Sequence, residues 1–172
     1  MIDLSVQVAA PGQHLAEAAT IWAEATAARD NDPDLAPLDQ ALPLIEQVVG
    51  SSPRSLLVVA IDNDTRVHGF AAIKPSDEPS DESTGESTGE LTAHIRYLGV
   101  RPSSWGLGVG RLLMRDLPGL LAAAGFTEGE LEVYLDNPRA VTLYESFGWL
   151  RDGDPTPHPR SGRLEQRYRL KL

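Results

Sequence analysis

The stretch that decides the fold is YLGVRPSSWGLGVGRLLM, residues 97–114. It begins as a partly apolar strand, passes through a Pro-Ser-Ser turn, carries glycine at every second position from Gly106 to Gly110, and continues as an apolar helical pattern. Glycine has no Cβ, so such a turn bends sharply and lets a bulky anion approach the backbone. Two interpretations follow: a tight strand-to-helix turn without a ligand, or a cradle of backbone N–H groups for a phosphate.

Two known phosphate-binding motifs are excluded for this turn. No Gly-Lys-Ser/Thr follows the glycines, as a nucleoside-triphosphate loop requires, and the spacing differs from the dinucleotide fingerprint. Arg111 lies in the first helical turn and adds a full positive charge to the partial charge of the helix N-terminus.

Hydrophobic periodicity along the rest of the chain predicts the order β-α-α-β-β-β-α-β-α-β-β. The strands are expected over residues 2–8, 55–62, 67–74, 91–100, 129–136, 149–154 and 163–172, and the helices over 13–29, 38–49, from 109 onward, and 138–147. This pattern predicts an α/β (α+β) fold, with a mixed sheet of about seven strands flanked by about four helices. Pro118 falls inside the third helical pattern and should kink or shorten that helix.

Residues 75–90, PSDEPSDESTGESTGE, form a low-complexity segment in which ESTG occurs twice. The segment has too little apolar surface to bury, so we expect a mobile loop. Its six acidic residues would attract a cationic acceptor, or the loop is a solvated insertion without a function.

Composition limits the class of protein. The chain has 172 residues, 41% of them hydrophobic, which fits one domain over residues 1–172. No apolar run approaches the roughly 18 residues of a membrane span, and we expect no signal peptide.

Cysteine is absent, which excludes disulfides and thiolate chemistry and fits a reducing cytoplasm. The net charge of -10 disfavours nucleic acid and weakly favours a cationic partner, although it also serves solubility alone. The preference for arginine over lysine is typical of a GC-rich bacterial genome.

A second segment, NPRAVTLYESFGW at residues 137–149, adds to the glycine-rich stretch. Together the two resemble the GNAT superfamily of CoA-dependent N-acyltransferases. The first resembles that family's strand, Val-x-Pro-like turn and Arg/Gln-x-x-Gly-x-Gly/Ala motif, with Trp105 in place of Arg or Gln. The second is similar to Asn-x-x-Ala-x-x-Leu/Phe-Tyr-x-x-x-Gly-Phe, with Trp149 in place of Phe. The order of elements also agrees, so the resemblance covers nearly the whole chain.

The resemblance implies a site for acetyl-CoA as co-substrate. In the family, CoA lies where the fourth and fifth strands splay apart, here residues 94–100 and 131–136. Backbone of Leu98 and Val100 would pair with the pantetheine arm, and the Val100 N–H would polarise the thioester carbonyl. Backbone from 106 to 111 would hold the pyrophosphate, and Asn137 would contact pantetheine or only cap its helix. The implied cofactor-binding residues are Leu98, Gly99, Val100, Trp105, Gly106, Leu107, Gly108, Val109, Gly110, Arg111, Asn137 and Tyr144.

The resemblance also implies catalytic residues. Tyr144 matches the family's tyrosine near the sulfur and would protonate the departing thiolate, unless it is only a core tyrosine. His94 occupies the position where some members place a glutamate base. Because His94 shares strand parity with Leu98 and Val100, we expect it to face the same cleft, although a single histidine on a strand is more often structural. Arg96 and Glu90 are further cleft candidates, and His68 is expected to be structural or exposed.

The leading hypothesis is an N-acetyltransferase that acts on a primary amine of a small molecule or peptide, weakly favoured to be cationic. The alternatives are a non-catalytic acyl-CoA-sensing module on the same fold, and an interaction protein acting through the acidic loop. We expect no metal, no nucleic acid and no membrane partner. A homodimer is possible.

Overall fold

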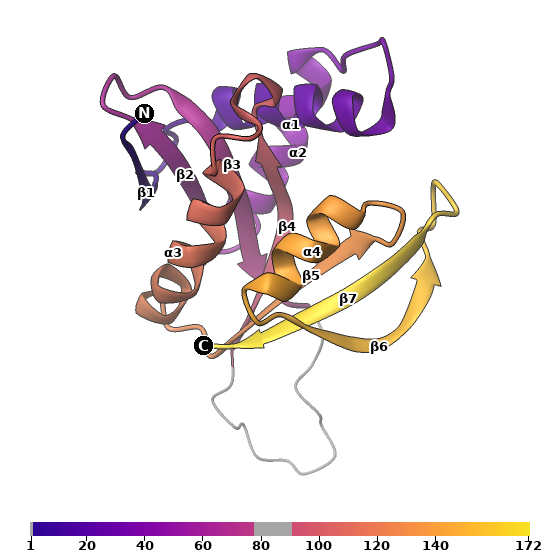
Figure 1. Cartoon of the computed structure of the whole chain (residues 1–172). Helices are drawn as coiled ribbons and strands as arrows, with labels where there is room; N and C mark the ends of the chain where they lie inside the picture. The colour runs from indigo at the N-terminus through magenta and orange to yellow at the C-terminus, as the bar shows by residue number, and fades with distance from the viewer. Residues whose placement is uncertain (1, 78–90) are drawn as a thin grey trace.

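The computed structural model describes residues 2–77 and 91–172 (Figure 1), so the loop expected at 75–90 lies outside the described residues from position 78 onward. The order of helices and strands agrees with the prediction, with one added 3-10 turn, η2 (Pro102–Ser104). The strands are β1 (Leu4–Val8), β2 (Leu56–Asp62), β3 (Val67–Pro75), β4 (Thr92–Val100), β5 (Glu128–Tyr134), β6 (Leu150–Pro157) and β7 (Leu164–Lys171). The helices are α1 (Leu15–Asp30), α2 (Leu38–Gly50), α3 (Val109–Ala123) and α4 (Pro138–Ser146).

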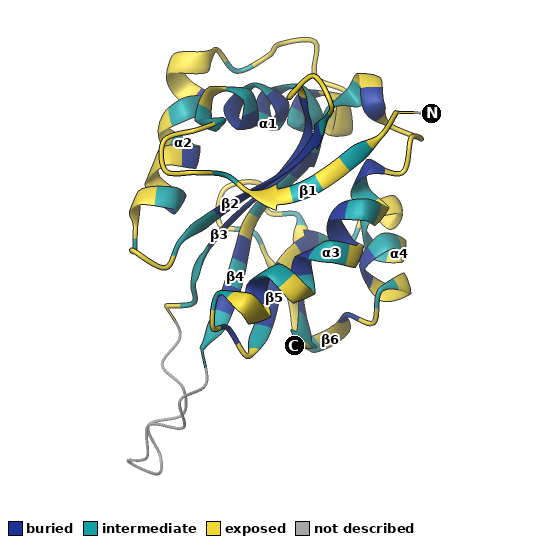
Figure 2. Cartoon of the chain, turned by 90° about the vertical axis from the view of Figure 1, so that its left-hand side faces the viewer, coloured by how far each residue is buried: buried dark blue, intermediate teal, exposed yellow. Residues whose placement is uncertain are grey.

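The seven strands form one sheet in the order β1-β2-β3-β4-β5-β7-β6. Helices α1 and α2 pack on one face, over β2 and β3, and α3 and α4 pack on the opposite face (Figures 1 and 2). Alternate residues of β2 and β3 therefore enter two separate hydrophobic clusters, one under each pair of helices. The predicted α/β fold with a mixed sheet is confirmed.

The only parallel pairing in this sheet joins β4 and β5, and it is short. It consists of the pairs Thr92–Glu128, Ala93–Gly129 and His94–Glu130. Beyond His94 the two strands diverge, so a V-shaped opening separates the rest of β4 from the rest of β5. The predicted splay between the fourth and fifth strands is confirmed.

A β-bulge interrupts β4 at Arg96. Tyr97 pairs with Ala72 and Ile95 pairs with Ile73, which leaves Arg96 as the extra residue. An extra residue shifts the alternation of side chains, so His94 and Tyr97 share the α1 face. Leu98 and Val100 pack against the cluster under α3 and α4.

The parity expected for His94 was therefore wrong. His94 lies on the α1 face of the sheet, opposite Leu98 and Val100, because the expectation assumed an uninterrupted strand.

Pro118 does not shorten α3, contrary to that part of the prediction, because the helix continues to Ala123. Proline removes one backbone hydrogen bond from a helix interior. Leu113, Leu117 and Leu121, which flank Pro118 at helical spacing, are completely buried, and their packing offsets the loss.

Trp149 fits the core because β5 carries glycine opposite it. A Cβ added at Gly129 would lie 2.8 Å from Trp149 Cη2. We expect Gly129→Ala to lower the free energy of unfolding by about 2 kcal/mol through overpacking. In a Trp149→Phe background the same change should cost much less, which urea denaturation of the four proteins of the double-mutant cycle would measure. Equal costs in both backgrounds would show that the two residues do not constrain each other.

Candidate active site at the β4–β5 splay

The glycine-rich turn presents an open array of backbone donors. Gly106 and Gly108 have φ values of 81° and 83°, which favour glycine, and a Cβ at either position would meet no atom within 4 Å. The amides of Trp105 and Leu107 donate within the turn, to the carbonyls of Pro102 and Ser104. Within the turn, the amides of five residues find no backbone acceptor among the described residues: Gly106, Gly108, Val109, Gly110 and Arg111. Their position at the N-terminus of α3 suits an anion.

Gly110 also permits a close approach of two helices. A Cβ at Gly110 would lie 3.3 Å from Leu143 Cδ2, so the absent side chain lets α4 pack against the start of α3. The helix that carries Tyr144 is thereby placed beside the turn.

Trp105 folds back toward the end of β4. Its indole Nε1 donates to the carbonyl oxygen of Val100 at 2.8 Å, and the Arg139 guanidinium lies 5.2 Å from the ring centroid. The Arg101 amide bonds to His68 on β3, so the N–H and C=O groups of Val100 point toward the splay. The Val100 carbonyl therefore accepts a hydrogen bond from the Trp105 indole, while the Val100 N–H still faces the splay.

A buried polar chain anchors the turn from behind. His68 Nδ1 lies 2.8 Å from Ser104 Oγ, and His68 Nε2 lies 2.8 Å from Asp62 Oδ2. His68 and Ser104 are both buried. Arg101 adds a guanidinium contact at 3.3 Å to the carbonyl of Val67. The β2–β3 hairpin thus fixes the segment from which the glycine turn starts. His68 is structural, one of the two expected possibilities, and Ser104 was not predicted from the sequence.

We expect Ser104→Ala to raise the KM for acetyl-CoA several-fold and to leave kcat nearly unchanged. The substitution leaves His68 Nδ1 buried without a partner, which costs about 1–3 kcal/mol and loosens the turn. Steady-state kinetics with varied acetyl-CoA would measure the effect, and Ser51→Ala, a serine at the end of α2 that bonds to Val48, is the matched control. An unchanged KM would contradict this anchoring role.

Tyr144 lies on α4, whose start is capped by Asn137. The Asn137 side-chain oxygen accepts from the Ala140 amide at 3.3 Å, and the chain leaves the helix through Gly148 at a φ of 87°. Tyr144 is buried in the cluster under α3 and α4, and burial raises the pKa of its hydroxyl to about 12. None of the described residues forms a hydrogen bond with this hydroxyl. The Tyr144 hydroxyl therefore stays protonated at physiological pH, and no described residue accepts a hydrogen bond from it.

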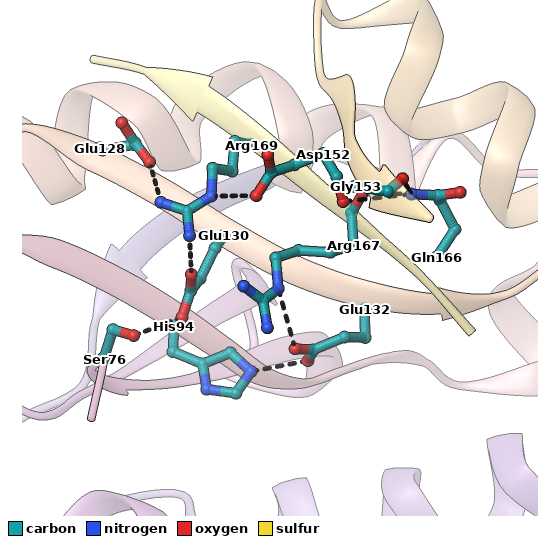
Figure 3. A network of polar contacts seen from close by, with 10 residues as sticks. All are labelled: Ser76, His94, Glu128, Glu130, Glu132, Asp152, Gly153, Gln166, Arg167 and Arg169. Atoms are coloured by element: carbon teal, nitrogen blue, oxygen red, sulfur yellow. Dashed lines mark hydrogen bonds and ion pairs between the residues drawn. The ribbon is translucent and has the colours of Figure 1, made fainter. Parts of the chain in front are cut away.

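His94 lies on the α1 face in contact with a carboxylate (Figure 3). Its Nε2 lies 2.9 Å from Glu132 Oε2, and Arg167 Nε lies 3.8 Å from Glu132 Oε1. The hydrogen bond from His94 and then the charges of His94, Arg167 and Arg96 hold the pKa of Glu132 below its usual range. Glu132 is thus a stable anion that orients the imidazole.

A second set of charges fixes β5 at the vertex of the splay (Figure 3). Arg169 contacts Glu128 and Asp152 at 2.6 Å each and Glu130 Oε2 at 3.3 Å. This Glu130 oxygen has no hydrogen bond of acceptable geometry, so the ion pair supplies its contact. Ser76 donates to the other Glu130 oxygen at 2.5 Å. The alternating acids of EGELE, residues 128–132, are the sequence signal that predicts such a polar face.

Two surface hollows lie away from the splay. A hollow of about 400 Å³ lies between β1 and α3, and one of about 120 Å³ lies beside Trp22 at the end of α1. Residues 2–77 and 91–172 contain no cluster of His, Asp and Glu arranged to hold a metal. In the same ranges no helix combines the length and apolar character needed to cross a bilayer.

Comparisons with known proteins agree on one family. The model of the acetyltransferase (GNAT) family matches residues 13–149. No curated protein matches the chain in sequence. Among solved structures, a proposed phosphinothricin N-acetyltransferase is 18% identical, with 99% of each chain covered and a TM-score of 0.75. A GCN5-related N-acetyltransferase from Kribbella flavida is 26% identical, with 98% of each chain covered and a TM-score of 0.69. The yncA protein from Salmonella typhimurium, solved with acetyl-CoA, is 19% identical over 98% of this chain and 94% of that one, with a TM-score of 0.66.

Proposed function

The chain belongs to the GNAT acetyltransferase family, and from that premise we propose that it transfers the acetyl group of acetyl-CoA directly to a primary amine. The observation that carries the proposal is the β4–β5 splay. Five unengaged amides lie at one side of it, Tyr144 is the buried proton donor on α4, and a histidine–carboxylate pair marks its vertex.

The pyrophosphate of acetyl-CoA is proposed to bind at the glycine turn. Five amides and the dipole of α3 supply the donors there, and Arg111 adds charge. The pantetheine arm would then enter the splay beside the free N–H of Val100, which would polarise the thioester carbonyl. The Trp105 indole donates a hydrogen bond to the Val100 carbonyl. We therefore propose that the pantetheine arm accepts a hydrogen bond from the Val100 N–H and makes none with the Val100 carbonyl.

The proton transfers are assigned to two residues. With Nε2–H of His94 donated to Glu132, Nδ1 is the nitrogen left to accept a proton from the acceptor's ammonium group. The neutral amine attacks the thioester carbonyl carbon, and the C–S bond breaks as the tetrahedral intermediate collapses. The departing CoA thiolate takes the Tyr144 proton, which burial keeps on the hydroxyl at physiological pH. The attacking nitrogen loses its second proton as the amide forms, and this proton restores the Tyr144 hydroxyl.

Two measurements test the proposal together. Calorimetric titration of acetyl-CoA should show binding to the folded protein, and release of free CoA thiol should depend on an added amine. Binding of acetyl-CoA without thiol release on a broad panel of amines would favour the acyl-CoA-sensing alternative. No binding at millimolar acetyl-CoA would overturn the proposal.

A further inference from the structure

Arg96 is the charged residue of the splay that has no partner of opposite charge. β4 and β5 are described throughout, and on these strands His94, Glu128, Glu130 and Glu132 all take part in ion pairs, whereas Arg96 takes part in none. Its side chain is exposed. The extra position of a β-bulge re-aims a side chain, and here it adds an arginine to the α1 face.

The Arg96 guanidinium lies against the ring of its neighbour Tyr97. Its Cζ lies 4.8 Å from the centroid of the Tyr97 ring, within the range of a cation–π contact. Tyr97 in turn makes an edge-to-face contact with Trp22 of α1, with centroids 6.0 Å apart. The aromatic pair joins β4 to α1, and it leaves the donors of the guanidinium uncommitted to any carboxylate.

Arg96 lies close to the proposed base. His94 and Arg96 are two residues apart in β4 and point to the same face, and the charge of Arg96 acts on Glu132 together with that of Arg167. Among the described residues, the charged groups near His94 are Arg96, Arg167, Glu132 and the Lys74–Asp77 pair, and Arg96 is the cation among them that contacts no carboxylate. The net charge of -10 is that of the whole chain. Because salt screens charges over about 8 Å at physiological ionic strength, the groups near His94 determine the electrostatic potential that an acceptor meets there.

We propose that the acceptor carries an anionic group, such as a carboxylate, a few atoms from its amine, and that Arg96 binds this group while His94 receives the amine's proton. The inference rests on the proposed function and names its substrate class. A guanidinium binds a carboxylate or similar oxyanion through two parallel N–H···O bonds, which orients the acceptor as well as holding it. An acceptor with a second cation at this position would be repelled by Arg96, contrary to the weak preference drawn from net charge.

Matched acceptors test the proposal. Each of a set of free L-amino acids is paired with its own amide, which keeps the amine and side chain and removes the anion. The ratio of kcat/KM for acid over amide is compared among the wild type, Arg96→Gln and the control Arg115→Gln, an exposed arginine of α3 paired with Asp116. We expect Arg96→Gln to lower this ratio 10- to 100-fold, and Arg115→Gln to leave it within twofold. Arg96→Lys should restore only part of it, because lysine keeps the charge without the planar fork.

The same acceptors give a second readout that does not need turnover. They are titrated into the protein saturated with CoA, and heat of binding is measured. Binding of acids that is lost in Arg96→Gln supports the proposal even if no thiol is released, in which case only the proposed acetyl transfer fails. A ratio unchanged by Arg96→Gln, or the absence of both turnover and binding for every acid, would overturn it.

Discussion

Tyr144→Phe is expected to lower kcat by about 10²–10³-fold and to leave the KM for acetyl-CoA within twofold, since general acid catalysis contributes rate enhancements of this size. The described residues make no hydrogen bond with the Tyr144 hydroxyl, so removing it breaks no structural contact. The pKa of about 12 means that Tyr144 itself causes no falling limb in the rate below about pH 11. Measuring thiol release from pH 6 to 10 for both proteins would show a loss of constant size.

Stability supplies an independent check on Tyr144. Its pKa in the folded protein, about 12, exceeds the ordinary value of 10.0, so the folded state holds its proton longer than the unfolded chain. The free energy of unfolding should therefore fall between pH 10 and 12, by up to about 1.4 kcal/mol per pH unit from this group, and Tyr144→Phe should lack that slope.

Tyr168→Phe is the matched control, because Tyr168 is a buried tyrosine of the same cluster whose hydroxyl donates to Glu145 at 2.7 Å. It should lose stability and keep its rate. A Tyr144→Phe protein with wild-type kcat would remove the general-acid assignment.

His94→Asn is expected to lower kcat/KM by about 10²–10³-fold near neutral pH, because the ammonium group of the acceptor then loses its proton acceptor. The deficit should shrink as pH rises, since an increasing share of the acceptor is already neutral. Glu132→Gln should cost less, about tenfold, and the double substitution should cost little more than His94→Asn alone, because the two residues act as a unit. Rate profiles of the four proteins across pH measure this coupling.

The acid stability of the same pair has a defined sign. The pKa of Glu132 is lowered in the folded protein, so its stabilising contribution is present above the usual carboxyl pKa and is lost as pH falls through the folded value. Glu132→Gln should flatten this part of the acid unfolding curve. Strictly additive losses of activity, or a His94→Asn enzyme that retains full rate, would show that His94 only supports the sheet.

Local sequence signals predicted most of this fold. Alternating and helical periodicity located the strands and helices, Asn137 and Pro138 marked the start of α4, and the glycines marked the turn, because these features depend on neighbours in the chain. The bulge at Arg96 was missed because a register shift is defined by the pairing of β4 with β3, and no local residue pattern signals it. Ser104 was missed for a related reason: its partner His68 is 36 positions away.

The acidic face of β5 is a different case. Glu128, Glu130 and Glu132 alternate with buried residues, and this pattern alone predicts a strand with one polar face. Their arginine partners come from β7, so the composition of one strand could not show that these acids are largely neutralised. Net charge consequently says little about the surface that meets the acceptor.

The single extra residue of β4 ties acceptor recognition to the length of this strand. Removing Arg96 would leave a strand of ordinary alternation, in which Leu98 stays under α3 and His94 stays on the α1 face. One codon would then remove the proposed anion receptor and leave the proposed proton acceptor in place. Length variation at this position is therefore a route by which related chains could keep CoA binding and change their acceptor, and a one-residue deletion protein that acetylates amino acid amides as well as the acids would demonstrate it.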